Sequence, residues 1–306
     1  MKIGIRIGSF LLAVLAAGVV IGQDQAAPEK ATKKTRLHVI GASVSGGFED
    51  GPLTGGEQGE SVTMQHVLKA WCGEHARAST HNPLDMAQLF LDAEGNGTRQ
   101  VEGAKKQKAD VVVAVDFLFW FAYGPVAGDE AAARSAKFEK GLALVASLGV
   151  PVVVGDLADM RGAAPRMLRA SWVPKKEVLA KLNERLAAFA QQNPNLKVVP
   201  LAALVRTMKD EGVDLPLAAG KLRASPGSLL QGDRLHANRL GMAFLGYSLQ
   251  DTLAAQFPDG HPLRGQKWTL DQFVDACGAG PDVEALQEAA TKAAAAPAGK
   301  DKGGAK

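Results

Sequence analysis

The chain has 306 residues, 46% of them hydrophobic, and a formal net charge of +3 at neutral pH. This length is enough for one domain with a substantial core. The small charge gives no basic stripe and so no reason to expect a nucleic-acid partner. The two cysteines, Cys72 and Cys277, lack the C-x-x-C spacing of metal and redox sites.

The first 22 residues are typical of a secretory signal peptide. Lys2 and Arg6 precede an apolar run over residues 10–21, after which small residues follow. The run is short for a membrane span of about 20 apolar residues, so a retained anchor is the second interpretation. Residues 23–35 predict a disordered leader. We therefore expect a secreted or periplasmic protein with no stable membrane insertion after signal removal.

A strand is expected at 37–40, and it ends in a run of small residues, Gly41-Ala42-Ser43-Val44-Ser45-Gly46-Gly47. Ligands of open α/β sheets bind outside the carboxyl ends of the strands, so the Ser43 hydroxyl is in a position suited to chemistry. Tight strand-to-helix packing is the alternative reason for such small residues. A dinucleotide fingerprint fails because Ser43 replaces its central glycine, and the G-x-S-x-G elbow fails at Ser45. The pattern G-x-S-x-[ST]-x-G is complete.

Downstream, short apolar runs alternate with amphipathic patterns. Strands are expected at 77–81, 110–116, 150–155 and 196–199, and helices at 61–71, 98–108, 129–148, 175–192 and 238–255. This alternation predicts a parallel sheet covered by helices on both faces. The loop 49–59 is expected to be a solvated connection, with a lid as the alternative. A short docked helix is expected at 268–276, and 281–306 is an Ala- and Lys-rich tail.

A second motif, Asp233-x-x-His236, precedes the last long helical pattern. A turn can place both side chains on one side, where the carboxylate orients the imidazole and stabilises it when charged. Capping of the following helix is the alternative role for Asp233. Taken with Ser43, the motif predicts a Ser-His-Asp arrangement.

These two blocks resemble those of the SGNH, or GDSL-type, family of serine hydrolases. The first block corresponds to Gly41–Ser45, with Ala42 where the family has aspartate, and the last corresponds to 233–241. The resemblance implies an α/β fold over residues 36–280, a flavodoxin-like three-layer sandwich with a mostly parallel five-stranded sheet.

The resemblance also implies an activity and its residues. Ser43 would be the nucleophile, His236 the general base and acid, and Asp233 the orienting carboxylate. The reaction would be hydrolysis of an ester, with the acyl group on a carbohydrate, a lipid or a small molecule. Neither a cofactor nor a metal is implied.

The oxyanion hole is where this chain departs from the family, which uses a glycine of its second block and an asparagine after the third strand. Here the third strand ends at Asp116 and aromatic residues follow. Asp116 is expected either as a protonated hydrogen-bond donor or as a charged acceptor of backbone N–H groups. Gly95 and Gly97 are the second-block candidates, beside the N–H of Ser43. Because the usual donors are missing, a non-catalytic binding protein on the same fold is the alternative function.

Two further alternatives follow from single residues. Asp116 and Asp156 end neighbouring strands and could hold a hard cation together with a histidine, although Asp156 could equally cap a helix. Cys72 and Cys277 could form a disulfide in an exported protein, with two buried free thiols as the alternative. A dinucleotide-binding protein would need an acidic residue at the end of the second strand, and none is visible there.

Overall fold

The computed structural model describes residues 34–49 and 61–295. The expected signal peptide, nearly all of the leader, most of the loop 49–59 and the end of the tail lie outside these residues. Within the described part, no helix is both long and apolar enough to span a bilayer.

Five parallel strands form the central sheet, in the order β2-β1-β3-β4-β5. They are β1 (Thr35–Val39), β2 (Ala76–Thr80), β3 (Val111–Ala114), β4 (Val152–Gly155) and β5 (Leu196–Val199). This order confirms the predicted flavodoxin-like arrangement, the one that the resemblance to SGNH hydrolases implies. From β1 the chain first places β2 on one side and then places β3, β4 and β5 on the other. The boundary between β1 and β3 is therefore the switch point, where ligands bind in such sheets. Val39 pairs with Val113 there, so the segments that follow the two strands emerge side by side.

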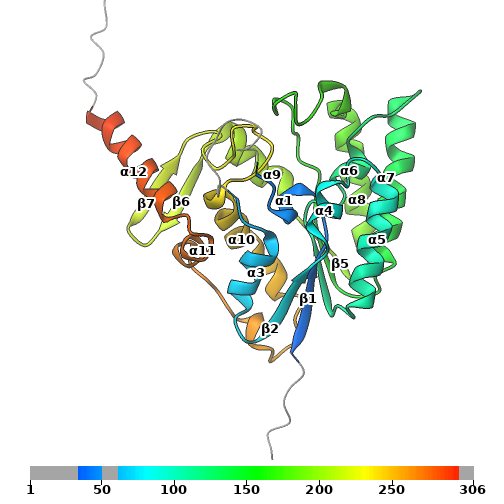
Figure 1. The fold of residues 1–306 in the computed structure, drawn as a ribbon, viewed down its shortest axis with the longest axis horizontal. Helices are drawn as coiled ribbons and strands as arrows, with labels where there is room; N and C mark the ends of the chain where they lie inside the picture. Colours follow the sequence, from blue (N-terminus) through cyan, green and yellow to red (C-terminus); the bar gives the residue numbers. More distant parts are fainter. Residues whose placement is uncertain (1–33, 50–60, 296–306) are drawn as a thin grey trace, which may run out of the picture. The chain divides into compact units, whose positions relative to one another are not determined.

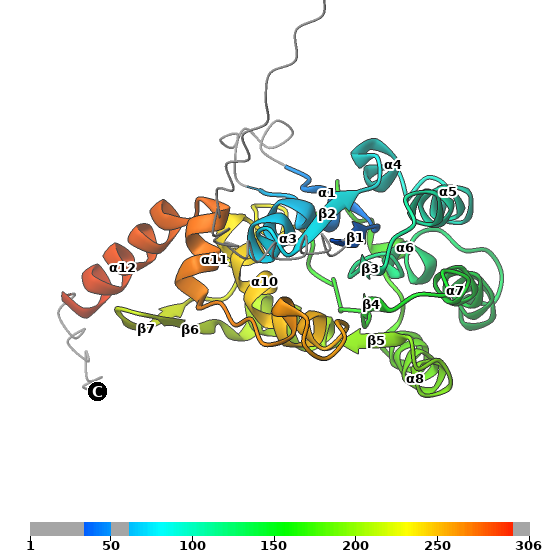
Figure 2. The same ribbon diagram turned by 90° about the horizontal axis from the view of Figure 1, so that it is seen from below.

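Helices cover both faces of the sheet, as predicted (Figures 1 and 2). One face carries α3 (Met64–Cys72), α10 (Arg239–Ala254) and α11 (Leu270–Cys277), and the other carries α5 (Ala93–Lys106), α7 (Glu130–Ala146) and α8 (Lys176–Gln192). A hydrophobic core lies on each side of the sheet. Because both faces are covered, β3 and β4 are apolar and buried throughout.

Several elements were not expected from the sequence. The short helices are α1 (Ser43–Gly46), α4 (Pro83–Ala87), α6 (Phe119–Ala122) and α9 (Leu201–Arg206), the last continuing as a π-helical turn, Thr207–Glu211. A hairpin of β6 (Val213–Leu217) and β7 (Gly220–Ala224) forms a second sheet. Pro216 lies inside β6 and weakens the strand pattern in the sequence, because proline cannot donate to a ladder.

The carboxyl-terminal segment also differs from expectation. Residues Gly280–Ala295 form helix α12, which takes up more than half of the region expected as a tail. Alanine has the highest intrinsic helix propensity, and Val283 and Leu286 pack against the core on the α10 side. The remaining residues of that tail lie outside the described part.

Cys72 and Cys277 are both free and buried, at the ends of α3 and α11. The structure therefore has the two thiols and not the disulfide. Burial raises the pKa of each thiol to about 12, so both remain protonated at neutral pH.

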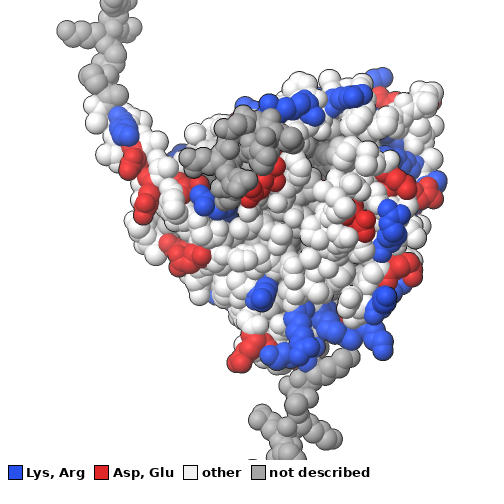
Figure 3. Space-filling view, viewed as in Figure 1, with Lys and Arg blue, Asp and Glu red and all other residues white. Residues whose placement is uncertain are grey.

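Charged side chains of both signs are distributed over the face shown in Figure 3. Lys and Arg side chains gather along its upper edge and at its lower end, with Asp and Glu among them or beside them.

Candidate active site

Ser43 is the first residue of α1, directly after the sharp turn that ends β1. Gly41 begins this turn with a φ of 157°. A Cβ atom at this position would lie 2.1 Å from Oδ1 of Asp116 and 2.7 Å from Oγ of Ser45, so only glycine fits. The close approach lets the turn sit directly on the end of β3.

Two buried polar side chains hold this turn in place. Gln100, on α5, accepts a hydrogen bond from the Gly41 N–H at 2.7 Å and donates one to the Gly41 carbonyl at 3.0 Å. Asp116, just after β3, accepts from the N–H groups of Ala42 at 3.0 Å and Ser45 at 3.1 Å, and from the Ser45 hydroxyl at 2.5 Å. These five hydrogen bonds fix the backbone on both sides of Ser43.

The structure brings Ser43, His236 and Asp233 together. The Oγ atom of Ser43 is 2.8 Å from Nε2 of His236, and Nδ1 of His236 is 2.5 Å from Oδ2 of Asp233. His236 is 2% exposed and Asp233 is fully buried. Serine, imidazole and carboxylate thus form a continuous hydrogen-bonded chain, the geometry by which a triad is recognised.

The loop around Asp233 keeps its carboxyl group ionised. Burial acts to raise the pKa of Asp233, but the hydrogen bond and positive charge of His236 act against it, as do the N–H groups of His236 and Leu235, and the net pKa is lowered. Those N–H groups donate to Oδ1 at 3.0 and 2.9 Å. Asp233 therefore presents a negative charge to the imidazole and leaves Oδ2 for Nδ1.

Phe48 and Gln231 support the imidazole from outside the triad. The rings of Phe48 and His236 pack with centroids 4.6 Å apart. Gln231 is 3% exposed, and its backbone N–H donates to the His236 carbonyl at 2.8 Å. Sequence reasoning missed Phe48, Gln231 and Gln100 as site residues, because an isolated Gln or Phe has no diagnostic spacing.

Comparison with known proteins gives similarities at the level of structure only. No model of a known protein family matches the chain. No curated protein sequence matches it.

Similar solved structures include an acetyl xylan esterase, with a TM-score of 0.42, 14% identity and coverage of 71% of this chain and 99% of the other. A protein described as an acylhydrolase from Bacteroides fragilis has a TM-score of 0.43 and 14% identity, covering 73% and 90%. A gut microbial diltiazem-metabolizing enzyme has a TM-score of 0.42 and 14% identity over 73% of this chain, but this chain covers only 47% of that enzyme.

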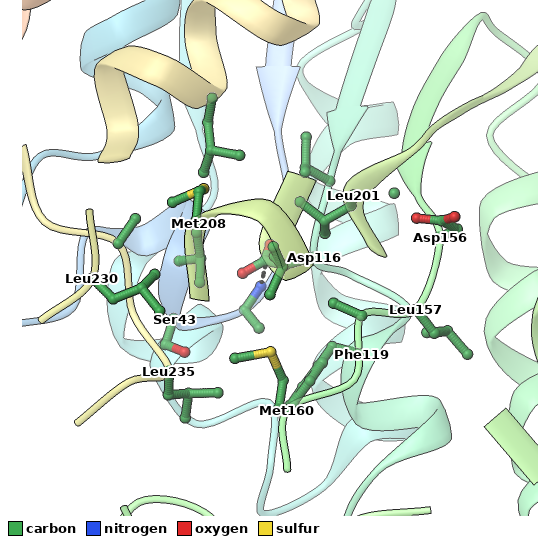
Figure 4. Close-up of a pocket in the computed structure, with 18 residues that line it drawn as sticks. Ser43, Asp116, Phe119, Asp156, Leu157, Met160, Leu201, Met208, Leu230 and Leu235 are labelled. Carbon is green, nitrogen blue, oxygen red and sulfur yellow. Dashed lines mark hydrogen bonds between the residues drawn. The ribbon is translucent and has the colours of Figure 1, made fainter. Parts of the chain in front are cut away.

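A cavity of about 60 Å³ opens beside Ser43. Figure 4 shows Ser43 at its edge, with Met160, Leu230 and Leu235 around it. Most of its lining side chains are apolar. Ser43 therefore faces a mostly hydrophobic space.

Asp116 lines this cavity, and its contacts distinguish between the two roles expected for it, a protonated donor and a charged acceptor. Each of its carboxylate oxygens accepts from a backbone N–H of the Gly41–Ser45 turn, at Ala42 or Ser45. An acceptor held in this way positions the turn and has no donor to offer a developing negative charge. The structure thus favours the charged, structural alternative for Asp116.

Gly95 and Gly97 are not brought to Ser43, and neither lines the cavity. Both lie inside α5, which begins earlier than expected because the Asp92 side chain caps it by accepting from the Gly95 N–H at 2.9 Å. Gly97 gives room for an aromatic ring, since a Cβ there would lie 2.9 Å from Phe121. These glycines serve helix capping and packing.

Two backbone N–H groups at the cavity are candidate oxyanion donors, that of Ser43, which the sequence predicted, and that of Val44. The N–H groups of Ser43 and Val44 begin α1, and neither has a hydrogen-bond acceptor among the described residues. Both residues line the cavity. The first turn of a helix leaves such groups available to an anion.

Asp156 has a structural role. Its Oδ1 accepts from the Ala202 N–H at 2.6 Å in the first turn of α9. Burial raises the pKa of Asp156, while this and other backbone hydrogen bonds act to lower it. In the part of the chain that the structure describes, no group of three or more His, Cys, Asp and Glu side chains is arranged to hold a metal ion.

Proposed function

We propose that this protein is a serine hydrolase that cleaves esters through an acyl-Ser43 intermediate. The observation that carries the proposal is the hydrogen-bonded chain Ser43–His236–Asp233, closed at 2.8 and 2.5 Å. Its imidazole is buried against Phe48 and its serine faces a cavity. A helix-capping role for Asp233 would not require a serine hydroxyl at the other ring nitrogen.

In the acylation step, Oγ of Ser43 attacks the ester carbonyl carbon while its proton passes to Nε2 of His236. Asp233 stabilises the imidazolium through Nδ1. The Ser43 N–H, with that of Val44, donates to the carbonyl oxygen as it becomes an oxyanion. The bond to the leaving oxygen then breaks, and His236 returns the proton to the departing alcohol.

Deacylation repeats these steps with water. His236 removes a proton from a water molecule as the water attacks the acyl-Ser43 carbonyl. The intermediate collapses with loss of Oγ, which takes the proton back from His236 and releases the carboxylic acid. No cofactor is needed for either half-reaction.

The direct test is labelling with a fluorophosphonate followed by peptide mapping. Such a probe phosphonylates a serine only where a base activates it, so the label should be found on Ser43 and on no other serine. Ser43→Ala should abolish labelling. Ser147→Ala, which changes an exposed serine on the far end of α7, should leave it intact. Absence of the label from the folded wild-type protein would instead favour the non-catalytic binding protein.

Export remains part of the proposal, supported by the basic and apolar character of the first 22 residues. Expression with the natural amino terminus in a bacterium should give a protein that begins near Gln23 and is recovered without detergent. Recovery of the intact amino terminus in the membrane fraction would show a retained anchor.

A further inference from the structure

The wall of the cavity beside Ser43 is almost entirely apolar. Of its 18 lining residues, only Ser43, Asp116 and Asp156 have polar side chains. Asp116 accepts hydrogen bonds from the N–H groups of Ala42 and Ser45, and Asp156 accepts one from the Ala202 N–H. Sugar hydroxyls would lose their hydrogen bonds to water in such a space, at a cost of about 1–3 kcal/mol each.

The wall is also larger than an acetyl group needs. A fully buried side chain contacts about 6–12 residues, and a methyl group contacts fewer. The wall here is contributed by α1, the ends of β3 and β4 with the segments that follow them, α6, α9 with its π-helical turn, the 230–237 loop and α10. An acetyl methyl group at Ser43 would leave most of this apolar surface uncovered.

The two observations together specify an occupant. We infer that this cavity binds the acyl part of the ester and that the part is an apolar chain longer than acetyl, with the alcohol part directed toward solvent. The inference rests on the proposed function, because Ser43 at the edge of the cavity is what would join to the acyl carbon (Figure 4). Among the esters that the sequence left open, the inference selects those with a lipid-like acyl group.

Val205 offers a way to shorten the cavity without touching the triad. It is a partly buried residue of α9 and lines the wall. Val205→Phe adds a ring to the wall. Leu204, the preceding residue of the same helix, packs against the opposite core and is not part of the wall. Leu204→Phe is therefore the matched control.

The experiment compares p-nitrophenyl acetate, butanoate, hexanoate, octanoate and decanoate as substrates of the purified protein. Each methylene buried in the cavity should raise kcat/KM about fourfold, the equivalent of about 0.8 kcal/mol, until the cavity is filled. Val205→Phe should move the optimum to a shorter ester. Leu204→Phe should keep the wild-type optimum.

Two results would overturn the inference alone. They are a wild-type kcat/KM that is highest for acetate or independent of chain length, and an optimum that Val205→Phe leaves in place. In either case, labelling and loss of hydrolysis in Ser43→Ala would still support the proposed function.

If the proposed function is wrong, the protein should neither hydrolyse the esters nor be labelled at Ser43. Calorimetry with octanoate and acetate then decides the inference without catalysis. Binding of octanoate but not acetate, lost in Val205→Phe and kept in Leu204→Phe, would support an apolar occupant. No binding of octanoate by the folded wild-type protein would overturn it.

Discussion

The side-chain amide of Gln231 donates a hydrogen bond of 2.8 Å to the carbonyl oxygen of Phe48, although the two residues are 183 positions apart. It also donates to the Ala237 carbonyl at 2.9 Å. One buried amide thus joins the loop that carries His236 to the segment that follows Ser43. Since Phe48 packs against the imidazole, this contact sets the position of His236 relative to Ser43.

Replacing Gln231 with Leu should lower kcat while changing KM little. The substitution leaves the carbonyl groups of Phe48 and Ala237 without this donor, so the imidazole loses its fixed distance from Ser43. A displacement of about 1 Å can cost on the order of a hundredfold in rate. Steady-state kinetics on a short-chain ester would measure the separate effects on kcat and KM.

Gln250→Leu is the matched control. Gln250 is also a buried glutamine, and it donates to the carbonyl groups of Tyr247 and Trp268, which do not line the cavity. Both variants should lose about 1–3 kcal/mol of unfolding free energy, because each leaves buried acceptors unpaired. Equal kcat values in the two variants would reduce Gln231 to a purely structural residue.

The triad predicts non-additive losses of activity. Ser43→Ala and His236→Ala should each lower kcat by a factor on the order of ten thousand or more, and the double variant should be little worse, because the two groups act as one unit. Asp233→Ala should cost less. Ester hydrolysis by purified variants, with folding checked by circular dichroism, is the measurement. Full activity in Ser43→Ala would exclude the mechanism, and activity abolished by a chelator would point to metal-assisted hydrolysis.

Asp116→Asn should destabilise the Gly41–Ser45 turn. An amide nitrogen cannot accept a hydrogen bond, so one of the donors at Ala42 and Ser45 loses its partner. We expect a loss of about 2–3 kcal/mol in unfolding free energy, a lower kcat and an unchanged alkaline side of the pH–rate profile. Disappearance of an alkaline fall in activity would restore Asp116 as a protonated donor.

Asp92→Asn provides the comparison for Asp116. Asp92 caps α5 at the Gly95 N–H, and it does not line the cavity. Its replacement should lower the unfolding free energy by less than about 1 kcal/mol, because asparagine also caps helices well. Its kcat should equal that of the wild type.

His38 should make the fold sensitive to mild acid. It is 3% exposed, and burial, with a smaller contribution from the charge of His81, lowers its pKa to about 4. Unfolded histidine has a pKa of about 6.5, so between these values the unfolded chain binds more protons than the folded one. The free energy of unfolding is therefore unaffected by His38 above pH 6.5. It decreases as the pH falls from 6.5 toward 4, by about 3 kcal/mol in all.

Urea unfolding at several pH values would measure this loss, with His38→Leu as the comparison. Leucine has no charge to acquire, while the Ser79 hydroxyl keeps its hydrogen bond to the Leu37 carbonyl at 3.1 Å. The variant should lose less stability than the wild type between pH 7 and 4.5. Parallel pH dependences of the two proteins would assign the acid sensitivity to other groups. Asp233, whose pKa is lowered, contributes stability that is lost only below its unfolded pKa of about 3.8.

The sequence by itself predicted the strands of the central sheet, the helical layers on its two faces, and Ser43, Asp233 and His236 as the residues of the candidate site. Hydrophobic period and length identify β1, β3, β4 and β5, because buried parallel strands are apolar on both faces. Ser43 and the Asp233-x-x-His236 block could be paired because each carries a local spacing. The rule that ligands bind at the carboxyl ends of strands then placed them at one edge of the sheet.

The tertiary structure decided the rest, because it depends on contacts between residues distant in sequence. Two glycines close together, such as Gly95 and Gly97, are typical of a turn. In the structure both belong to α5, because Asp92 caps the helix at the Gly95 N–H and Gly97 packs against the rings of Phe117 and Phe121. The sequence allowed Asp116 either to donate or to accept a hydrogen bond. The structure places the Gly41–Ser45 turn beside the end of β3, where its N–H groups donate to Asp116. The clamps by Gln100 and Gln231 bridge 59 and 183 residues. No local pattern encodes such a pairing, since packing alone brings a buried amide to its partner.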